Sequence, residues 1–168
     1  IDECCNILDS KRVPLNFSDR DLAPGEIPYY GANGVQGYIN KHIFDEELIL
    51  LAEDGGNFNQ FQTRPIAYKI SGKSWVNNHA HVLKNKKGFD LNFIFYSLVH
   101  KNITPFVQGT TRGKLNQQEL KKIKIPFPKD QREAQKISSM LSNTDELIQK
   151  QQQVIEQTQK LMKGQMKN

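Results

Sequence analysis

The feature that most constrains the fold is the C-terminal stretch that follows Asp130. It contains neither proline nor glycine until Gly164, so no residue in it is a strong helix breaker. Asp130 and Glu133 have the spacing of a capping box, which favours a helix start. We predict a helix of about 30 residues, roughly 45 Å long. Residues 142 to 145 (Ser-Asn-Thr-Asp) are a possible break, because their side chains compete for backbone hydrogen bonds.

The apolar residues of this predicted helix form two neighbouring heptad rows. The rows are Met140, Leu147, Val154, Leu161 and Leu141, Ile148, Ile155, Met162. Polar residues flank them at a third heptad position, which costs stability but restricts register and partner. A helix that projects from one small domain cannot bury this stripe, so we predict that it packs on another helix. The alternative is that the helix folds back on its own domain.

The first half of the chain is rich in predicted strands. Asn33-Gly34 suits a tight turn between apolar flanks, which predicts a hairpin. Residues 48 to 52 and 65 to 70 are typical of buried or half-buried strands, and residues 75 to 83 alternate as one further strand. We predict an α+β fold, with a domain over residues 1–128 and a helix over residues 129–168.

Two short helices are predicted inside this domain. Asp90 precedes apolar residues that recur at helical spacing, which predicts a helix from residue 91. Asn116 and Glu119 have the spacing of a second capping box, which predicts a helix over about residues 117 to 123. Pro126 and Pro128 exclude a helix afterwards, so we expect residues 123 to 128 to close the domain as a strand.

Hydropathy and cysteine content predict the cellular location of the protein. No apolar run approaches the roughly 20 residues that cross a bilayer, so we expect no membrane association. Cys4 and Cys5 are adjacent, which disfavours a bridge between them, and two cysteines make no disulfide framework. A cytoplasmic location is the simplest expectation.

Charge is distributed unevenly, and this points to a polyanionic ligand. Residues 1–60 hold four basic and eleven acidic side chains, whereas residues 61–128 hold twelve basic and two acidic ones. A block this basic, with aromatic residues among its lysines, is typical of a nucleic-acid surface. Lysines that only solubilise an exposed face would give the same pattern.

The loop at residues 109 to 114 is the best local candidate for nucleic-acid contact. Its glycines allow close backbone approach, its threonines can donate to phosphate, and Arg112 can bind phosphate or guanine. An ordinary polar loop with a surface arginine remains the alternative. The full predicted contact set is Tyr30, Asn33, Arg64, Lys73, Asn77, Asn78, His79, Thr110, Thr111, Arg112 and Lys114.

Catalytic patterns in the chain are weak. The glycines at 31, 34 and 37 lack the dinucleotide-binding spacing. His79 and His81 lie two apart, so on a strand both would point to one face and could share a metal, with Glu53 or Asp54 as a third ligand by residue type alone. A metal-dependent nuclease using His79 and His81 is therefore one alternative function. A satisfied structural histidine pair explains the same residues, and we expect no catalysis by this chain.

Five segments, in order, resemble the specificity subunit of type I restriction-modification enzymes. They are IPYYGANGVQGYI at 27–39, LLAEDGGNF at 50–58, WVNNHAHVL at 75–83, GTTRGKLNQQELKKIKIPFP at 109–128 and DQREAQKISSMLSNTDELI at 130–148. The family usually has Glu-Gln where this chain has Asp130-Gln131, which is a mild departure. The resemblance covers nearly the whole chain.

The resemblance implies a function and a set of partners. Residues 1–128 would be a target recognition domain for double-stranded DNA, and the C-terminal helix would be a spacer. Family subunits commonly carry two such units over a bipartite target, so this single unit would act as a homodimer or as half of a longer chain. Methyltransferase and restriction subunits would supply catalysis and bind S-adenosylmethionine, ATP and Mg²⁺, with no cofactor on this chain. A recognition segment of a fused restriction-methylation enzyme is a further alternative.

Overall fold

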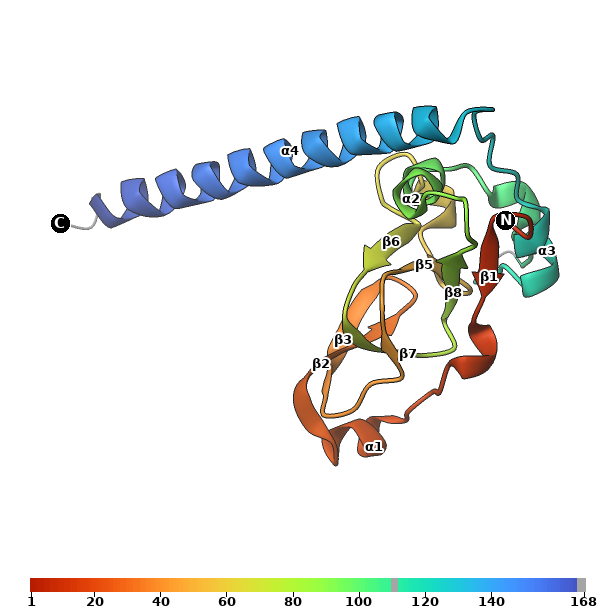
Figure 1. Ribbon diagram of the computed structural model, residues 1–168. Helices are drawn as coiled ribbons and strands as arrows, with labels where there is room; N and C mark the ends of the chain where they lie inside the picture. Colours follow the sequence, from red (N-terminus) through yellow and green to blue (C-terminus); the bar gives the residue numbers. More distant parts are fainter. Residues whose placement is uncertain (110–111, 166–168) are drawn as a thin grey trace.

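Two four-stranded sheets stack on each other, and a helix covers the outer face of the first sheet (Figure 1). The computed structural model describes residues 1–109 and 112–165. The first sheet has the order β1 (Cys5–Ile7), β8 (Ala80–Asn85), β5 (Leu48–Ala52), β6 (Ala67–Ile70), with antiparallel neighbours throughout. The second has the order β3 (Gly34–Ile39), β2 (Pro24–Gly31), β7 (Lys73–Val76), β4 (Phe44–Asp45), in which β2 and β7 run parallel.

The first sheet is buried on both faces, and β5 shows this most clearly. Ile49 and Leu51 join the larger apolar core, which also contains Ile94 of the covering helix. Leu48 and Leu50 join the smaller core, between the two sheets. All residues of β5 are fully buried, which explains why the sequence reads as a continuous apolar run there.

Short helices connect the strands, and side chains that the sequence identified cap two of them. The α-helices are α1 (Phe17–Asp21), α2 (Leu91–Leu98) and α3 (Gln117–Lys122), and the 3-10 helices are η1 (Asp9–Lys11), η2 (Phe58–Gln60) and η3 (Thr104–Phe106). The Asp90 side chain accepts from the Phe93 amide before α2, and the Asn116 side chain accepts from the Glu119 amide before α3. Both helix starts confirm the prediction.

The last helix, α4 (Gln131–Gln165), is continuous through residues 142 to 145. Its first turns pack on α2, where Ala134 and Ser138 are buried. The Tyr96 hydroxyl donates to Asp145 Oδ2 at 2.8 Å. Beyond this contact the helix projects away from the sheets (Figure 1). The helix therefore does not fold back along its own domain.

The apolar stripe of α4 is exposed to solvent. Its eight residues range from 40% exposed at Leu141 to 70% exposed at Met140. Thr144 and Thr158, at the flanking polar position, donate their hydroxyls to the carbonyls of Met140 and Val154. The helix start differs slightly from the prediction, because Asp130 Oδ1 accepts from the Arg132 amide rather than from Glu133.

Three other local predictions can be compared with the structure. The hairpin is confirmed, since β2 pairs with β3 and Gly34 takes a φ of 113° in the turn. The single strand over residues 75 to 83 is wrong. Asn77 Oδ1 accepts from the His79 amide, and the chain turns there from β7 in one sheet to β8 in the other.

The strand predicted over residues 123 to 128 is also wrong. This segment joins neither sheet. Phe127 instead packs its ring on Phe89 and Phe93, with ring centroids 4.9 Å apart in each case. Prolines at 126 and 128 remove two amide donors from the segment, so side-chain packing rather than a ladder holds it.

Two further observations concern the cysteines and the membrane. Cys4 and Cys5 are both buried and both free. Among the described residues, none of the helices combines the length and apolar character that a membrane span requires.

Candidate nucleic-acid interface

Five of the predicted contact residues line one shallow cavity of about 370 Å³. They are Asn33, Asn77, Asn78, His79 and Arg112. These residues come from three separate loops, and the spacing of the sequence alone does not bring them together. The cavity thus brings together five of the eleven predicted nucleic-acid contacts.

Sheet topology explains this convergence. β2 and β7 run parallel, so the turn after β2 and the turn after β7 lie at the same end of their sheet. The Asn77 amide donates to the carbonyl of Tyr30 across this end, at 3.0 Å. β5 runs antiparallel to β8, so the end of β5 meets the start of β8, and Glu53 donates its amide to the carbonyl of His79. Asp54 therefore lies beside the same turn.

Asp54 joins two of the predicted residues. Its Oδ1 lies 2.8 Å from His79 Nδ1 and 2.8 Å from Arg112 Nη2. The Asp54 side chain is 19% exposed, whereas His79 and Arg112 are 36% and 65% exposed. An ionised carboxylate only accepts hydrogen bonds, so His79 donates from Nδ1. The three side chains form an outer cluster at the rim of the cavity.

Asn77 is buried in the cavity wall and holds two neighbouring residues in place. Its Nδ2 donates to Gln36 Oε1 at 3.1 Å, and its Oδ1 accepts from the His79 amide at 2.8 Å. Neighbouring Asn78 is exposed. Asn77 thus orients the turn, whereas the side-chain amide of Asn78 is exposed at the surface.

Backbone hydrogen bonds hold both ends of the segment that carries Arg112. The backbones of Gln108 and Lys114 exchange hydrogen bonds of 2.8 and 2.7 Å, and Leu115 donates its amide to the carbonyl of Glu53. Gly113 is tightly enclosed, since a Cβ there would lie 2.8 Å from Val107 Cγ1. Arg112 therefore projects from an ordered base. Thr110 and Thr111 lie outside the described residues.

The other predicted contacts that the structure describes do not line this cavity. Tyr30 packs toward Tyr68, with ring centroids 6.2 Å apart, and its neighbour Tyr29 lines the cavity in its place. Arg64 bonds to the Gln60 side chain at 3.1 Å. Lys73 begins β7, at the end of that strand opposite to Asn77. Lys114 lies 3.4 Å from Glu53 Oε1.

The acidic and basic segments of the chain partly neutralise each other in space. Ion pairs join Lys84 to Glu46, Lys121 to Asp2, Lys114 to Glu53 and Arg112 to Asp54. Each pair links the acidic first third of the chain to the basic middle. The strong positive charge of residues 61–128 is therefore reduced at these positions.

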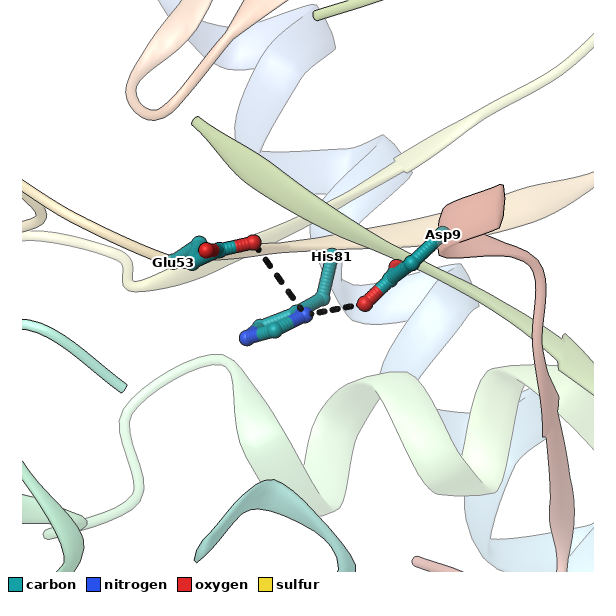
Figure 2. Close-up of side chains that lie close together, drawn as sticks. All are labelled: Asp9, Glu53 and His81. Atoms are coloured by element: carbon teal, nitrogen blue, oxygen red, sulfur yellow. Dashed lines mark hydrogen bonds and ion pairs between the residues drawn. The ribbon is translucent and has the colours of Figure 1, made fainter. Parts of the chain in front are cut away.

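A second, inner cluster is formed by Asp9, Glu53 and the buried side chain of His81. Figure 2 shows Asp9, Glu53 and His81 pointing toward one another. His81 is 1% exposed, and its Nδ1 lies 2.6 Å from Asp9 Oδ2 and 3.8 Å from Glu53 Oε2. Its Nε2 faces the carbonyl of Leu115 at 2.7 Å. By residue type alone, these three side chains could hold a metal ion.

Arg12 provides the positive charge of this inner cluster. Its Nη1 lies 2.7 Å from Glu53 Oε2 and donates to the carbonyl of Ala80 at 2.8 Å. Both nitrogens of His81 already lie within hydrogen-bond distance of protein oxygens, those of Asp9 and the Leu115 carbonyl, so a cation would have to displace one of these contacts. These residues fit a closed structural network and do not fit a metal site.

The network also shifts the ionisation of Asp9. Burial alone would raise the pKa of Asp9, but the hydrogen bond from His81, the amide of Val82 and the charge of Arg12 outweigh it, and the pKa is lowered. His79 and His81 contact different carboxylates, so the structure does not bring them together in the shared metal site that their spacing would allow.

Besides Tyr29, the cavity is lined by three polar side chains that are absent from the predicted contact set, namely Arg20, Gln36 and Asp54. Gln36 lies two residues after the Asn33-Gly34 turn. Asp54 follows a fully buried strand and precedes two glycines, which is a place where functional side chains gather.

The fold and the cavity define a class of protein: an α+β module that presents cationic and amide side chains at one end of its sheets and projects a long helix. Residues 1–157 match the family described as type I restriction modification DNA specificity domain. The chain belongs to this family.

Known relatives agree with this assignment. A type I restriction enzyme specificity subunit of Haemophilus influenzae is 38% identical over 128 residues, which are 76% of this chain and 32% of that protein. The EcoprrI specificity subunit of Escherichia coli is 23% identical over 120 residues, or 71% of this chain and 28% of that protein. The chain thus spans about a third of the length of these relatives.

A solved structure shows the same fold. The S subunit of a type I restriction-modification system from M. genitalium superimposes with a TM-score of 0.71 at 20% identity, and the match covers 86% of this chain and 37% of that one. The α+β fold with a long C-terminal helix is therefore that of an S subunit.

Proposed function

We propose that this chain recognises a specific sequence of double-stranded DNA and directs a type I restriction-modification system to it. The observation that carries the proposal is the convergence of Asn33, Asn78, His79 and Arg112 on one cavity. Side chains of these types read base edges or bind phosphate in known complexes. Membership of the specificity-domain family supports the same function.

The cavity residues suggest how a duplex would be read. Asparagine and glutamine amides pair with adenine in the major groove, which suits exposed Asn78 and Gln36. Arginine pairs with guanine O6 and N7, which suits Arg112. Lys114, half exposed beside the loop, suits a phosphate contact that sets the register without reading sequence.

Catalysis in this proposal belongs to partner subunits. Methyltransferase subunits would bind S-adenosylmethionine, and a restriction subunit would use ATP and Mg²⁺. This chain would contribute recognition alone, whether as a separate subunit or as a segment of a fused enzyme.

The projecting part of α4 supports a second proposal, that two such units pair through their helices. Eight apolar side chains lie exposed along α4 in two adjacent rows, six of them beyond the contact of Tyr96 with Asp145. An isolated helix of this kind gains its stability from packing. A helix of 35 residues is about 52 Å long. This exceeds the roughly 34 Å of one turn of B-DNA, so the pair could separate two half-sites.

DNA binding tests the main proposal. The full chain is titrated into a labelled duplex chosen from a randomised library, and binding is followed by fluorescence anisotropy at several salt concentrations. Replacing Arg112 by alanine is expected to weaken binding by about 1 to 3 kcal/mol. The matched control is Arg132→Ala, which removes an exposed arginine from α4. Equal binding by both variants and the unchanged chain would remove Arg112 from the interface.

Sedimentation tests the pairing of helices. The unchanged chain is expected to form a dimer at tens of micromolar, and Leu147→Lys with Ile155→Lys is expected to yield monomers because lysines would enter the apolar seam. Gln149→Lys with Gln153→Lys places the same charges on the polar face of the same helix and should leave the dimer intact. A monomeric unchanged chain would contradict the proposal.

A further inference from the structure

Asp54 is an unexpected residue at a surface that is to meet DNA. Its carboxylate lies at the rim of the cavity, where it would repel phosphate. It is only 19% exposed, and its Oδ1 is shared by His79 and Arg112 at 2.8 Å each. The carboxylate is therefore held from two sides and is not a mobile surface group.

The backbone under Arg112 strengthens this arrangement. A Cβ on Gly55 would lie 3.4 Å from Arg112 Nε, so the guanidinium lies across this glycine. Gly55 has a φ of 62°, which side chains rarely adopt. Its amide donates to the carbonyl of Gly113, which ties the two loops together. Arg112 is thus oriented by a carboxylate at its tip and by close backbone at its base, although its side chain is 65% exposed.

We propose that Asp54 determines specificity by positioning Arg112 and by opposing phosphate at the same place. The proposal rests on the proposed function, since it concerns how the cavity selects its DNA. A guanidinium carries five N–H donors, and the contact with Asp54 uses Nη2, which leaves other donors for guanine O6 and N7.

The consequence is a difference in affinity between the target sequence and other sequences. On the target, Arg112 keeps its bond to Asp54 and adds a bidentate bond to guanine. On any other sequence, Arg112 would have to leave Asp54 to reach a phosphate, and the negative charge of Asp54 would repel that phosphate. Specificity is a difference of affinities, and Asp54 widens it by weakening the wrong complexes.

The experiment compares the unchanged chain with Asp54→Asn, Asp54→Glu, Arg112→Ala and the double variant Asp54→Asn with Arg112→Ala. The probes are a duplex selected from a randomised library by the unchanged chain and a scrambled duplex of the same length and composition. Affinity for each is measured across a range of salt concentrations. Thermal unfolding of each variant establishes that it is folded.

We expect Asp54→Asn to bind the scrambled duplex more tightly and to reduce the ratio of the two affinities by at least about fivefold. Its salt dependence on the scrambled duplex should steepen by about 0.9 in the log-log slope, which is one added phosphate contact. Asp54→Glu keeps the charge and should keep most of the ratio. In Arg112→Ala, adding Asp54→Asn should change the ratio little, because the residue that Asp54 positions is gone.

Three outcomes would overturn the inference. If Asp54→Asn weakens both complexes equally, Asp54 has a structural role only. If the unchanged chain prefers its selected duplex and Asp54→Asn keeps that preference, this inference fails and the proposed function stands. If the unchanged chain binds no duplex, the proposed function fails and this inference fails with it.

Discussion

Glu53 and Asp54 are consecutive carboxylates at the end of β5, yet they belong to two clusters with opposite properties. Each cluster joins carboxylate to histidine and arginine: Asp9, Arg12, Glu53 and His81 inside, and Asp54, His79 and Arg112 outside. His81 is 1% exposed and Arg12 12%, whereas His79 is 36% exposed and Arg112 65%. The two clusters contain the same kinds of side chain, but one is buried inside the domain and the other is exposed at the candidate interface.

The inner cluster links distant parts of the chain. Asp9 and Arg12 come from the N-terminal region, and His81 comes from β8. The carbonyl of Leu115 comes from the segment that follows Arg112. Each charged group has a partner of opposite charge or a backbone acceptor. Breaking such a network leaves charges unpaired in a buried place. Breaking an ion pair of the outer cluster should cost little free energy of unfolding, because solvent can hydrate the separated charges.

The largest expected effect is that of His81→Ala. It leaves the Asp9 carboxylate and the carbonyl of Leu115 without their partner, and we expect the free energy of unfolding to fall by about 3 kcal/mol. Urea denaturation measures this as a lower midpoint with an unchanged slope. His79→Ala in the outer cluster is the matched control and should cost less than about 0.5 kcal/mol. Equal losses would erase the distinction between the clusters.

The next effect is that of Asp9→Asn, which also changes the response to acid. The pKa of Asp9 is lowered from its ordinary value of 3.8, so its contribution is fully present above that value and is lost as pH falls through the folded pKa. We expect the variant to be about 2 kcal/mol less stable at pH 7. The difference should shrink as pH falls below 4.

Unfolding midpoints measured from pH 7 down to pH 2 give this comparison directly. Asp21→Asn removes an exposed carboxylate from α1 and serves as the control, with a curve that follows the unchanged chain. Parallel curves for Asp9→Asn and the unchanged chain at all pH values would contradict the role of Asp9.

The smallest expected effect on stability is that of Arg112→Ala. Its ion pair with Asp54 is exposed on the arginine side, so we expect the free energy of unfolding to change by less than about 0.5 kcal/mol. Arg12→Ala, measured in the same way, should lose several times more because Glu53 and Asp9 would stay buried without it. A large loss from Arg112→Ala would mean that the outer cluster is structural too.

Signals between near neighbours in sequence predicted much of the fold. The caps at Asp90 and Asn116, the Asn33-Gly34 hairpin and the uninterrupted helix after Asp130 depend on residues a few positions apart. The predictions that failed depend on distant partners. Residues 75 to 83 divide between two sheets, and the segment 123–128 joins neither sheet but packs Phe127 on Phe89 and Phe93.

The candidate site divides in the same way. The sequence by itself determined that the segment 109–114 is polar and cationic, that Asn33 lies in a tight turn and that the last helix carries an unpaired apolar stripe, since each property depends on local residue types. Only the tertiary structure decided that Asn33, Asn78 and Arg112 share a cavity, that Asp54 joins them and that His79 and His81 separate. The physical reason is that the parallel pairing of β2 with β7 and the antiparallel pairing of β5 with β8 bring together strand ends that no local pattern relates.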